Sequence, residues 1–198
     1  KFVKKATKLQ ILDIYNCCVT PLLTDKKGNV FSFNDLSINY SDYINNSSKF
    51  SKFFLFYKIN KTSFNPTDLY VIPIKGMGLW DKIYGYLVIS DDGNTVVGTT
   101  FYKQNETAGL GANITNPSFL SNFCHKKIFK TSSSDSNKLL EAPLGITIVK
   151  KATKAKLSST EVDGISGATL TCQGVTNAYK NSLEPYRHFL IVLKKKKK

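Results

Sequence analysis

The 198 residues include 28 lysines and arginines against 14 aspartates and glutamates, and 41% of the residues are apolar. This composition predicts one globular domain with a sizeable core, and no run reaches the ~18 apolar residues that would cross a bilayer. Residues 194–198 supply five of the net +14 charges and are expected to form a disordered tail. The other lysines are scattered, which argues against nucleic-acid binding.

The chain begins with a predicted helix over residues 5–16, and polar loops with short elements follow over residues 24–48. The aromatic residues near Phe53 could be a base-stacking platform, but lysines at both ends of a short apolar run favour a buried strand. The predicted strands cover residues 52–58, 70–74, 84–90, 95–102 and 145–150, with a hairpin turn at Asp92-Gly93. We therefore expect a mostly antiparallel sheet in a single α+β domain.

Helices are expected at both ends of the chain. Residues 171–183 have helical apolar spacing, and Pro185 should end that helix and begin another over residues 186–193. The polar stretch over residues 131–138 is interpreted as a loop insertion.

The most informative segment is a loop of small residues from Asp163 to Thr171 that leads directly into the predicted helix. Thr171 is a plausible N-cap, and Gly167 and Ala168 would let a ligand approach the backbone. A helix start offers unpaired N–H groups and a partial positive charge, so this loop predicts a phosphate site. The alternative is an ordinary capped helix that follows a glycine turn.

The loop, as Asp-x-x-Ser-Gly-Ala-Thr, resembles the flavinylation signature of the FMN-binding domain family. In that family the last threonine is esterified to the phosphate of FMN, which implies Thr169 here. Two further segments, over residues 76–87 and 100–111, extend the resemblance to the NqrC family of the Na+-translocating NADH:quinone oxidoreductase (Nqr). This sequence departs from the family at Ala108, usually proline, at Cys172, usually serine, and at the insertion over residues 131–138.

The resemblance implies a set of residues around FMN. They are the loop residues Ser166, Gly167, Ala168, Thr169, Leu170 and Thr171, and the residues Glu106, Thr107, Gly109, Leu110 and Gly111 with Trp80. Leu110 and Trp80 would pack on the flavin ring, while Glu106 and Thr107 would reach its polar atoms. Trp80 could equally be a core tryptophan.

The resemblance also implies a function. The chain would be an electron-transfer subunit with covalent FMN, in a membrane complex that couples NADH oxidation and quinone reduction to Na+ export. Its partners would be the other subunits, an FMN transferase during maturation and the bacterial inner membrane. A missing N-terminal single-pass helix would anchor the protein there, with the domain on the outer, periplasmic face. The alternatives are the RnfG component of the related Rnf electron transport complex and a non-redox binding module with an unmodified loop.

The expected domain organisation is an N-terminal helix with loops over residues 1–48, the FMN-binding domain over residues 49–193, and the lysine tail. No nucleophilic catalytic arrangement is found in the sequence. The four cysteines and two histidines lack the spacing of a metal site, so no metal is expected. Adjacent Cys17 and Cys18 could form only a strained vicinal disulfide, and all four cysteines are interpreted as packing thiols.

Overall fold

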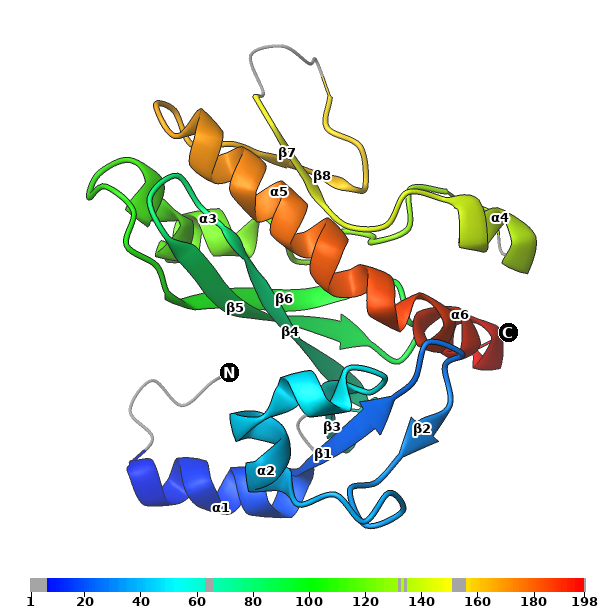
Figure 1. The fold of residues 1–198 in the computed structure, drawn as a ribbon. Helices are drawn as coiled ribbons and strands as arrows, with labels where there is room; N and C mark the ends of the chain where they lie inside the picture. The colour runs from blue at the N-terminus through cyan, green and yellow to red at the C-terminus, as the bar shows by residue number, and fades with distance from the viewer. Residues whose placement is uncertain (1–6, 63–65, 132, 134, 151–155, 198) are drawn as a thin grey trace.

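A six-stranded antiparallel sheet, in the order β2-β1-β3-β4-β5-β6, forms the centre of the fold (Figure 1). The strands are β1 (Val19–Thr24), β2 (Val30–Phe31), β3 (Phe54–Ile59), β4 (Leu69–Met77), β5 (Lys82–Ser90) and β6 (Val96–Lys103). The structure is a computed structural model that describes residues 7–62, 66–131, 133, 135–150 and 156–197. After its exposed first residue, β5 alternates buried and half-buried residues, so one face of the sheet faces the core.

One long helix, α5, crosses this sheet and separates it from a small second sheet (Figure 1). The second sheet pairs β7 (Thr147–Val149) with β8 (Glu161–Asp163) in parallel. The helices are α1 (Lys8–Cys18), α2 (Tyr40–Asn45), α3 (Pro117–Ser121), α4 (Ser136–Glu141), α5 (Thr169–Leu183) and α6 (Arg187–Lys196). Short 3-10 turns are η1 (Ser47–Phe50), η2 (Gly111–Thr115) and η4 (Glu184–Tyr186).

Small residues let α5 lie very close to β4. A Cβ atom at Gly174 would stand 2.2 Å from the carbonyl oxygen of Met77, and one at Gly76 would stand 2.5 Å from the Cβ of Ala178. Any larger side chain at these positions would push the helix away from the sheet. The position of the start of α5, where the predicted phosphate loop lies, is therefore set by close packing along the helix.

The core divides into two clusters. The larger one lies between the sheet and helices α5 and α6, and Phe56 and Tyr179 are among its fully buried members. The Tyr179 hydroxyl lies 2.8 Å from that of Thr99, which satisfies its polar atom inside the core. A smaller cluster, built around Leu23 and Leu55, packs beneath α2. Tyr186 connects the two, because it belongs to the larger cluster while its hydroxyl donates to the carbonyl oxygen of Leu55 at 2.6 Å.

The elements predicted from the sequence are largely confirmed. The α+β class, the antiparallel hairpin of β5 and β6, and the aromatic strand β3 are all present, with short elements in the loops over residues 24–48. The N-terminal helix begins at Lys8 and runs to Cys18, and residues 5 and 6 of the prediction lie outside the described residues.

Other elements differ from the prediction. Strands β1 and β8 were not predicted, and α4 begins inside the stretch that was interpreted as a loop insertion. The lysine run expected to be disordered instead continues α6 through Lys196. An amphipathic helix that is already packed on the core can extend into a run of lysines, because lysine is a good helix former.

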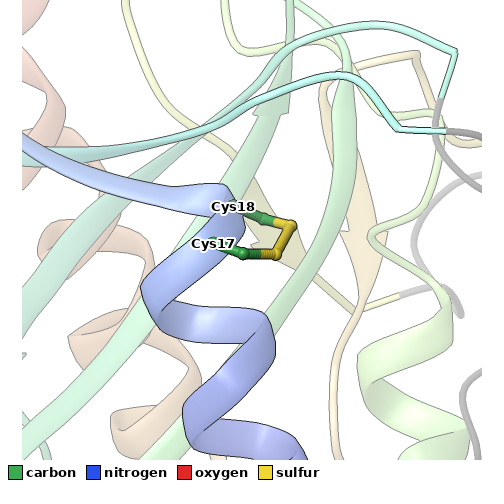
Figure 2. The surroundings of a disulfide bond; sticks show 2 residues. All are labelled: Cys17 and Cys18. Carbon is green, nitrogen blue, oxygen red and sulfur yellow. A yellow bond between two sulfur atoms is a disulfide. The ribbon is translucent and has the colours of Figure 1, made fainter.

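The interpretation of Cys17 and Cys18 as packing thiols is wrong, because the structure joins them in a vicinal disulfide at the end of α1 (Figure 2). Neither residue belongs to the core: Cys17 is exposed, Cys18 is half-buried, and α1 has no buried residue. Cys124 and Cys172 keep free thiols. Only Cys172 is buried, and burial raises the pKa of its thiol, as expected of a packing cysteine.

Candidate functional site

The predicted phosphate loop ends at the first residue of α5. Gly167 has a positive φ of 75°, a conformation that glycine adopts without strain, and Ala168 is the N-cap. No side chain caps this helix start, and the first helical bond runs from the amide of Cys172 to the carbonyl oxygen of Ala168 at 2.9 Å. The amides of the first turn are therefore available to a ligand. Thr169, the first helical residue, is exposed to solvent beside them.

Thr171 does not cap the helix, which corrects the expectation from the sequence. The helix begins two residues earlier, so Thr171 lies within the first turn, where it is 1% exposed. Its hydroxyl donates a short hydrogen bond to the Oε2 atom of Glu106. The two threonines of the loop are thus in opposite situations: the hydroxyl of Thr171 is engaged inside the protein, whereas Thr169 faces solvent.

Glu106 holds the three segments of the site together through its carboxylate. In addition to Thr171, it accepts hydrogen bonds from the amide of Leu79 at Oε2 and the amide of Trp80 at Oε1, each at 3.1 Å. The residue is only 8% exposed. Burial alone would raise the pKa of this carboxyl, but the hydrogen bonds from Thr171, Trp80 and Leu79 outweigh it and lower the pKa. Glu106 is therefore an ionised, buried acceptor that fixes the turn before β5 to the start of α5.

Two glycines make room for this contact. A Cβ atom at Gly78 would stand 2.4 Å from Oε1 of Glu106. A Cβ atom at Gly111 would stand 2.5 Å from the hydroxyl oxygen of Thr171. Gly111 was expected to let the backbone approach a ligand, but its immediate neighbours are Glu106 and Thr171. We define Gly78, Glu106, Gly111 and Thr171 as the carboxylate clasp.

A cavity of about 210 Å³ lies between the carboxylate clasp and the start of α5. Leu79, which the sequence did not single out, contributes to its wall. The predicted site residues Glu106, Thr107, Leu110, Gly111, Gly167, Ala168, Thr169, Leu170 and Thr171 complete the lining. None of these residues is a lysine or arginine. Segments that are far apart in the sequence thus converge on one apolar hollow with the Thr169 hydroxyl at its edge.

The structure places three predicted residues outside the lining of this cavity. Trp80 is 65% exposed, so its interpretation as a core tryptophan is wrong, and its indole Nε1 donates to the Thr107 hydroxyl at 3.0 Å. Gly109 is exposed with a φ of 77°. Its carbonyl oxygen accepts from the side-chain amide of Asn113 at 2.9 Å, which shapes the loop that carries Leu110.

The third of these residues, Ser166, lines a second cavity of about 630 Å³ on the other side of the same loop. This cavity lies between β7, β8 and α5, and it shares Gly167 and Thr169 with the first. Ile148, Ile165 and Cys172 supply apolar wall. The sequence did not predict this hollow, because β8 itself was not predicted. Thr169 is consequently accessible from two cavities.

The geometry can now be compared with known proteins. A family model described as an FMN-binding domain matches residues 78–184. The chain belongs to the FMN-binding domain family. The match includes all three segments of the site, from Gly78 through Glu106 to the loop at Thr169, and it ends just after α5.

Among relatives in this family, the chain is similar to NqrC, the C-type component of the Na(+)-translocating NADH-quinone reductase, of Chlamydia muridarum and of Chlamydia caviae. Identity to the first is 42% over 194 residues, 87% of this chain and 61% of that protein. Identity to the second is 40% over 205 residues, 91% of this chain and 64% of that protein. The chain therefore spans less than two thirds of the length of these relatives.

Solved structures of family members agree in fold. The crystal structure of the NqrC protein from Parabacteroides distasonis has a TM-score of 0.72 at 28% identity, covering 94% of this chain and 85% of that one. The NqrC structure from Shewanella oneidensis has the same score and identity, with coverages of 96% and 90%. The resemblance to the NqrC family and the expected FMN-binding domain fold are confirmed.

Two further searches bear on membranes and metals. No helix in the described part of the chain combines the length and apolar character needed to span a membrane. Among the described residues, no group of three histidine, cysteine or acidic side chains is placed to hold a metal ion. The candidate site is therefore the hollow beside Thr169.

Proposed function

We propose that this chain is the FMN-carrying, electron-transfer part of a Na+-translocating NADH:quinone reductase, and that the phosphate of FMN is esterified to Thr169. One observation carries the proposal: of the two threonines in the loop, only Thr169 is exposed, and it stands at an uncapped helix start beside the apolar cavity. Thr171 is committed to Glu106 and is buried.

The residues present fit an esterified phosphate. A phosphodiester keeps about one negative charge, and the start of α5 would offset that charge by ~0.3–1 kcal/mol while its free amides donate hydrogen bonds. Gly167 allows close approach, because it carries no side chain at the point where the loop enters the helix. A lysine is not needed under this arrangement, since the ester bond already holds the group in place.

The remaining residues would hold and shield the flavin ring. Leu79, Leu110 and Leu170 offer apolar surface at the cavity and are each between 43% and 58% exposed. Trp80 stands next to the cavity through its hydrogen bond to Thr107. Bound FMN supplies one- and two-electron transfer. In our proposal these side chains exclude water from the ring, and Glu106 acts indirectly, by fixing the segments that carry them.

The partners follow from the relatives' names. We propose the other subunits of the reductase as partners, with an FMN transferase that forms the ester during maturation. We also propose that the chain is anchored in the bacterial inner membrane through an N-terminal helix, with this domain on the outer face. The proposed division into residues 1–48, 49–193 and 194–198 is compatible with the family match, because residues 78–184 fall within the middle part.

The proposal is tested by producing the full chain with and without an FMN transferase and measuring the intact mass after denaturation. We expect a single added FMN, less one water, and a yellow colour that survives denaturation, only when the transferase is present. Thr169→Ala should lose both. An unmodified wild-type chain, from cells in which the same transferase modifies another family member, would contradict the proposal.

A further inference from the structure

The end of β5 opposite to Thr169 carries a different kind of hollow. β5 has nine residues and spans about 27 Å, so this hollow is remote from the flavin site. Its volume is about 620 Å³, and its lining includes Lys127, Lys130 and Lys194 together with the hydroxyl-bearing residues 158–160. We call it the lysine cavity. Nothing in the proposed flavin chemistry uses it.

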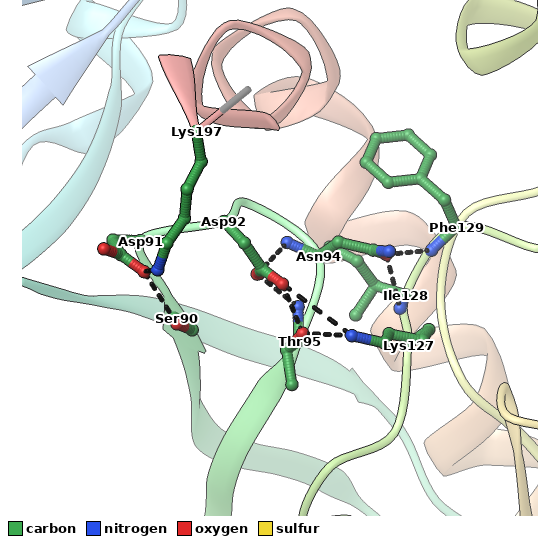
Figure 3. A network of polar contacts seen from close by, with 9 residues as sticks. All are labelled: Ser90, Asp91, Asp92, Asn94, Thr95, Lys127, Ile128, Phe129 and Lys197. Carbon is green, nitrogen blue, oxygen red and sulfur yellow. Dashed lines mark hydrogen bonds and ion pairs between the residues drawn. The ribbon is translucent and has the colours of Figure 1, made fainter. Parts of the chain in front are cut away.

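The walls of the lysine cavity are fixed by hydrogen bonds between distant segments. The amide of Lys127 donates to the carbonyl oxygen of Ser159 at 2.8 Å. Asn94, which is 6% exposed, accepts from the amides of Ile128 and Phe129 at 3.2 and 3.0 Å (Figure 3). These bonds tie the turn between β5 and β6 to the segments behind it. The cavity is consequently part of the packed fold.

The acidic groups nearby are already compensated. Asp92 accepts hydrogen bonds from the amides of Asn94 and Thr95 at 2.9 and 2.7 Å, and it also contacts the Thr95 hydroxyl and the ammonium of Lys127 (Figure 3). Asp91 pairs with Lys197 beyond the cavity. Glu161 accepts from the amide of Ser158 at 3.0 Å. These three carboxylates therefore have donors of their own.

Two lysines in the lining have no carboxylate partner in the described part of the chain. Lys130 donates to the neutral hydroxyl of Thr147, and the ammonium of Lys194 has no recorded ion pair or hydrogen bond there. Lys194 lies in the last turn of α6, where the partial negative charge of the helix end offsets only part of one positive charge. Two ammonium groups and several hydroxyls thus share a concave, built surface with an excess of positive charge.

We propose that the lysine cavity binds a phosphate group, carried either by a small soluble molecule or by a lipid headgroup. A phosphate presents several acceptor oxygens to ammonium and hydroxyl donors at once, and lysine binds it as a compact point charge. The adjoining lysines, Lys195 to Lys197, extend the positive field toward solvent and would attract an anion.

The first test is an NMR titration of the full chain with inorganic phosphate at constant ionic strength. We expect saturable shifts at the amides of Lys130, Ser159 and Thr160. The variant Lys130→Gln/Lys194→Gln should bind about tenfold more weakly or worse, because two charge-assisted contacts are lost. The control Lys49→Gln/Lys52→Gln removes the same charge from an exposed turn and should leave binding unchanged.

The second test asks which source of phosphate is used. Flotation with phosphatidylcholine vesicles is compared with flotation when phosphatidylglycerol is added. Vesicle binding that is lost in Lys130→Gln/Lys194→Gln and kept in the control supports a lipid headgroup. Saturable binding of free phosphate without vesicle binding supports a soluble ligand. Failure of both assays, or an equal loss in the control variant, would overturn the proposal.

Discussion

The two ends of β5 present positive charge in different ways. At one end, the hollow beside Thr169 has no lysine or arginine in its lining, and its positive character comes from the uncapped start of α5. At the other end, the lysine cavity contains three lysines beside the last turn of α6. Backbone amides supply the charge in the first hollow, and side-chain ammonium groups supply it in the second.

This difference teaches that the net charge of +14 is a poor guide to the flavin site. Amides at a helix start are held in one direction by the helix itself, so they can favour one geometry of a bound group. Lysine side chains are long and hydrated, and salt screens their attraction for an anion. The first hollow is thus suited to a fixed cofactor, and the second to a group that binds and leaves.

The largest effect should come from filling the space that the carboxylate clasp leaves open. Gly111→Ala would place a methyl group 2.5 Å from the Thr171 hydroxyl oxygen, so we expect the free energy of unfolding to fall by ~1–3 kcal/mol. Gly98→Ala is the matched control, because no atom lies within 4 Å of its added Cβ, and it should leave stability unchanged or raise it. Urea unfolding of both variants measures this, and equal destabilisation would break the link between the clasp and the fold of the site.

The next effect depends on pH. The pKa of Glu106 in the folded protein is below its ordinary value of 4.5, so its ionised form stabilises the fold above that pH. This contribution should disappear as the pH falls through the lowered pKa. Glu106→Gln should be less stable than the wild type by about 1–2 kcal/mol at pH 7, since charge-assisted hydrogen bonds are replaced by weaker ones. In melting experiments from pH 7 to pH 3 the gap should shrink below about pH 4.5. A gap that stays constant with pH would contradict an ionised Glu106.

The smallest effect should come from the lysine cavity. Lys130→Gln/Lys194→Gln removes two charges that have no carboxylate partner in the described structure, so we expect stability to change by no more than ~0.5 kcal/mol. Added phosphate should raise the melting temperature of the wild type and leave that of the variant unchanged. Strong destabilisation of the variant without phosphate would show that these lysines support the fold, and the contrast with the carboxylate clasp would be lost.

The sequence predicted the parts of the fold that depend on local patterns. The hairpin of β5 and β6 could be recognised because apolar residues flank an Asp-Gly turn. Strand β1 was missed because it directly follows a helix and contains Pro21, and β8 because three residues carry too little pattern. Pairing of β1 with β3 is decided by contacts between distant residues, which the sequence does not display.

The same limit applies to the candidate site. The loop at Thr169 was recognisable, because its small residues and hydroxyls are neighbours in the chain. The role of Thr171 was not, because its acceptor, Glu106, lies 65 residues away. From sequence alone, a threonine before an apolar helix resembles an N-cap. Only the fold reveals that the helix starts earlier and that the second hydroxyl is already engaged.

The central claim is that the fold selects Thr169 over Thr171 as the attachment residue. The most direct measurement is tandem mass spectrometry of the peptide that contains both threonines, after production with an FMN transferase. The account predicts FMN on Thr169 alone, with no adduct in Thr169→Ala and a retained adduct in Thr171→Ala. An adduct on Thr171, or one that survives Thr169→Ala, would contradict it.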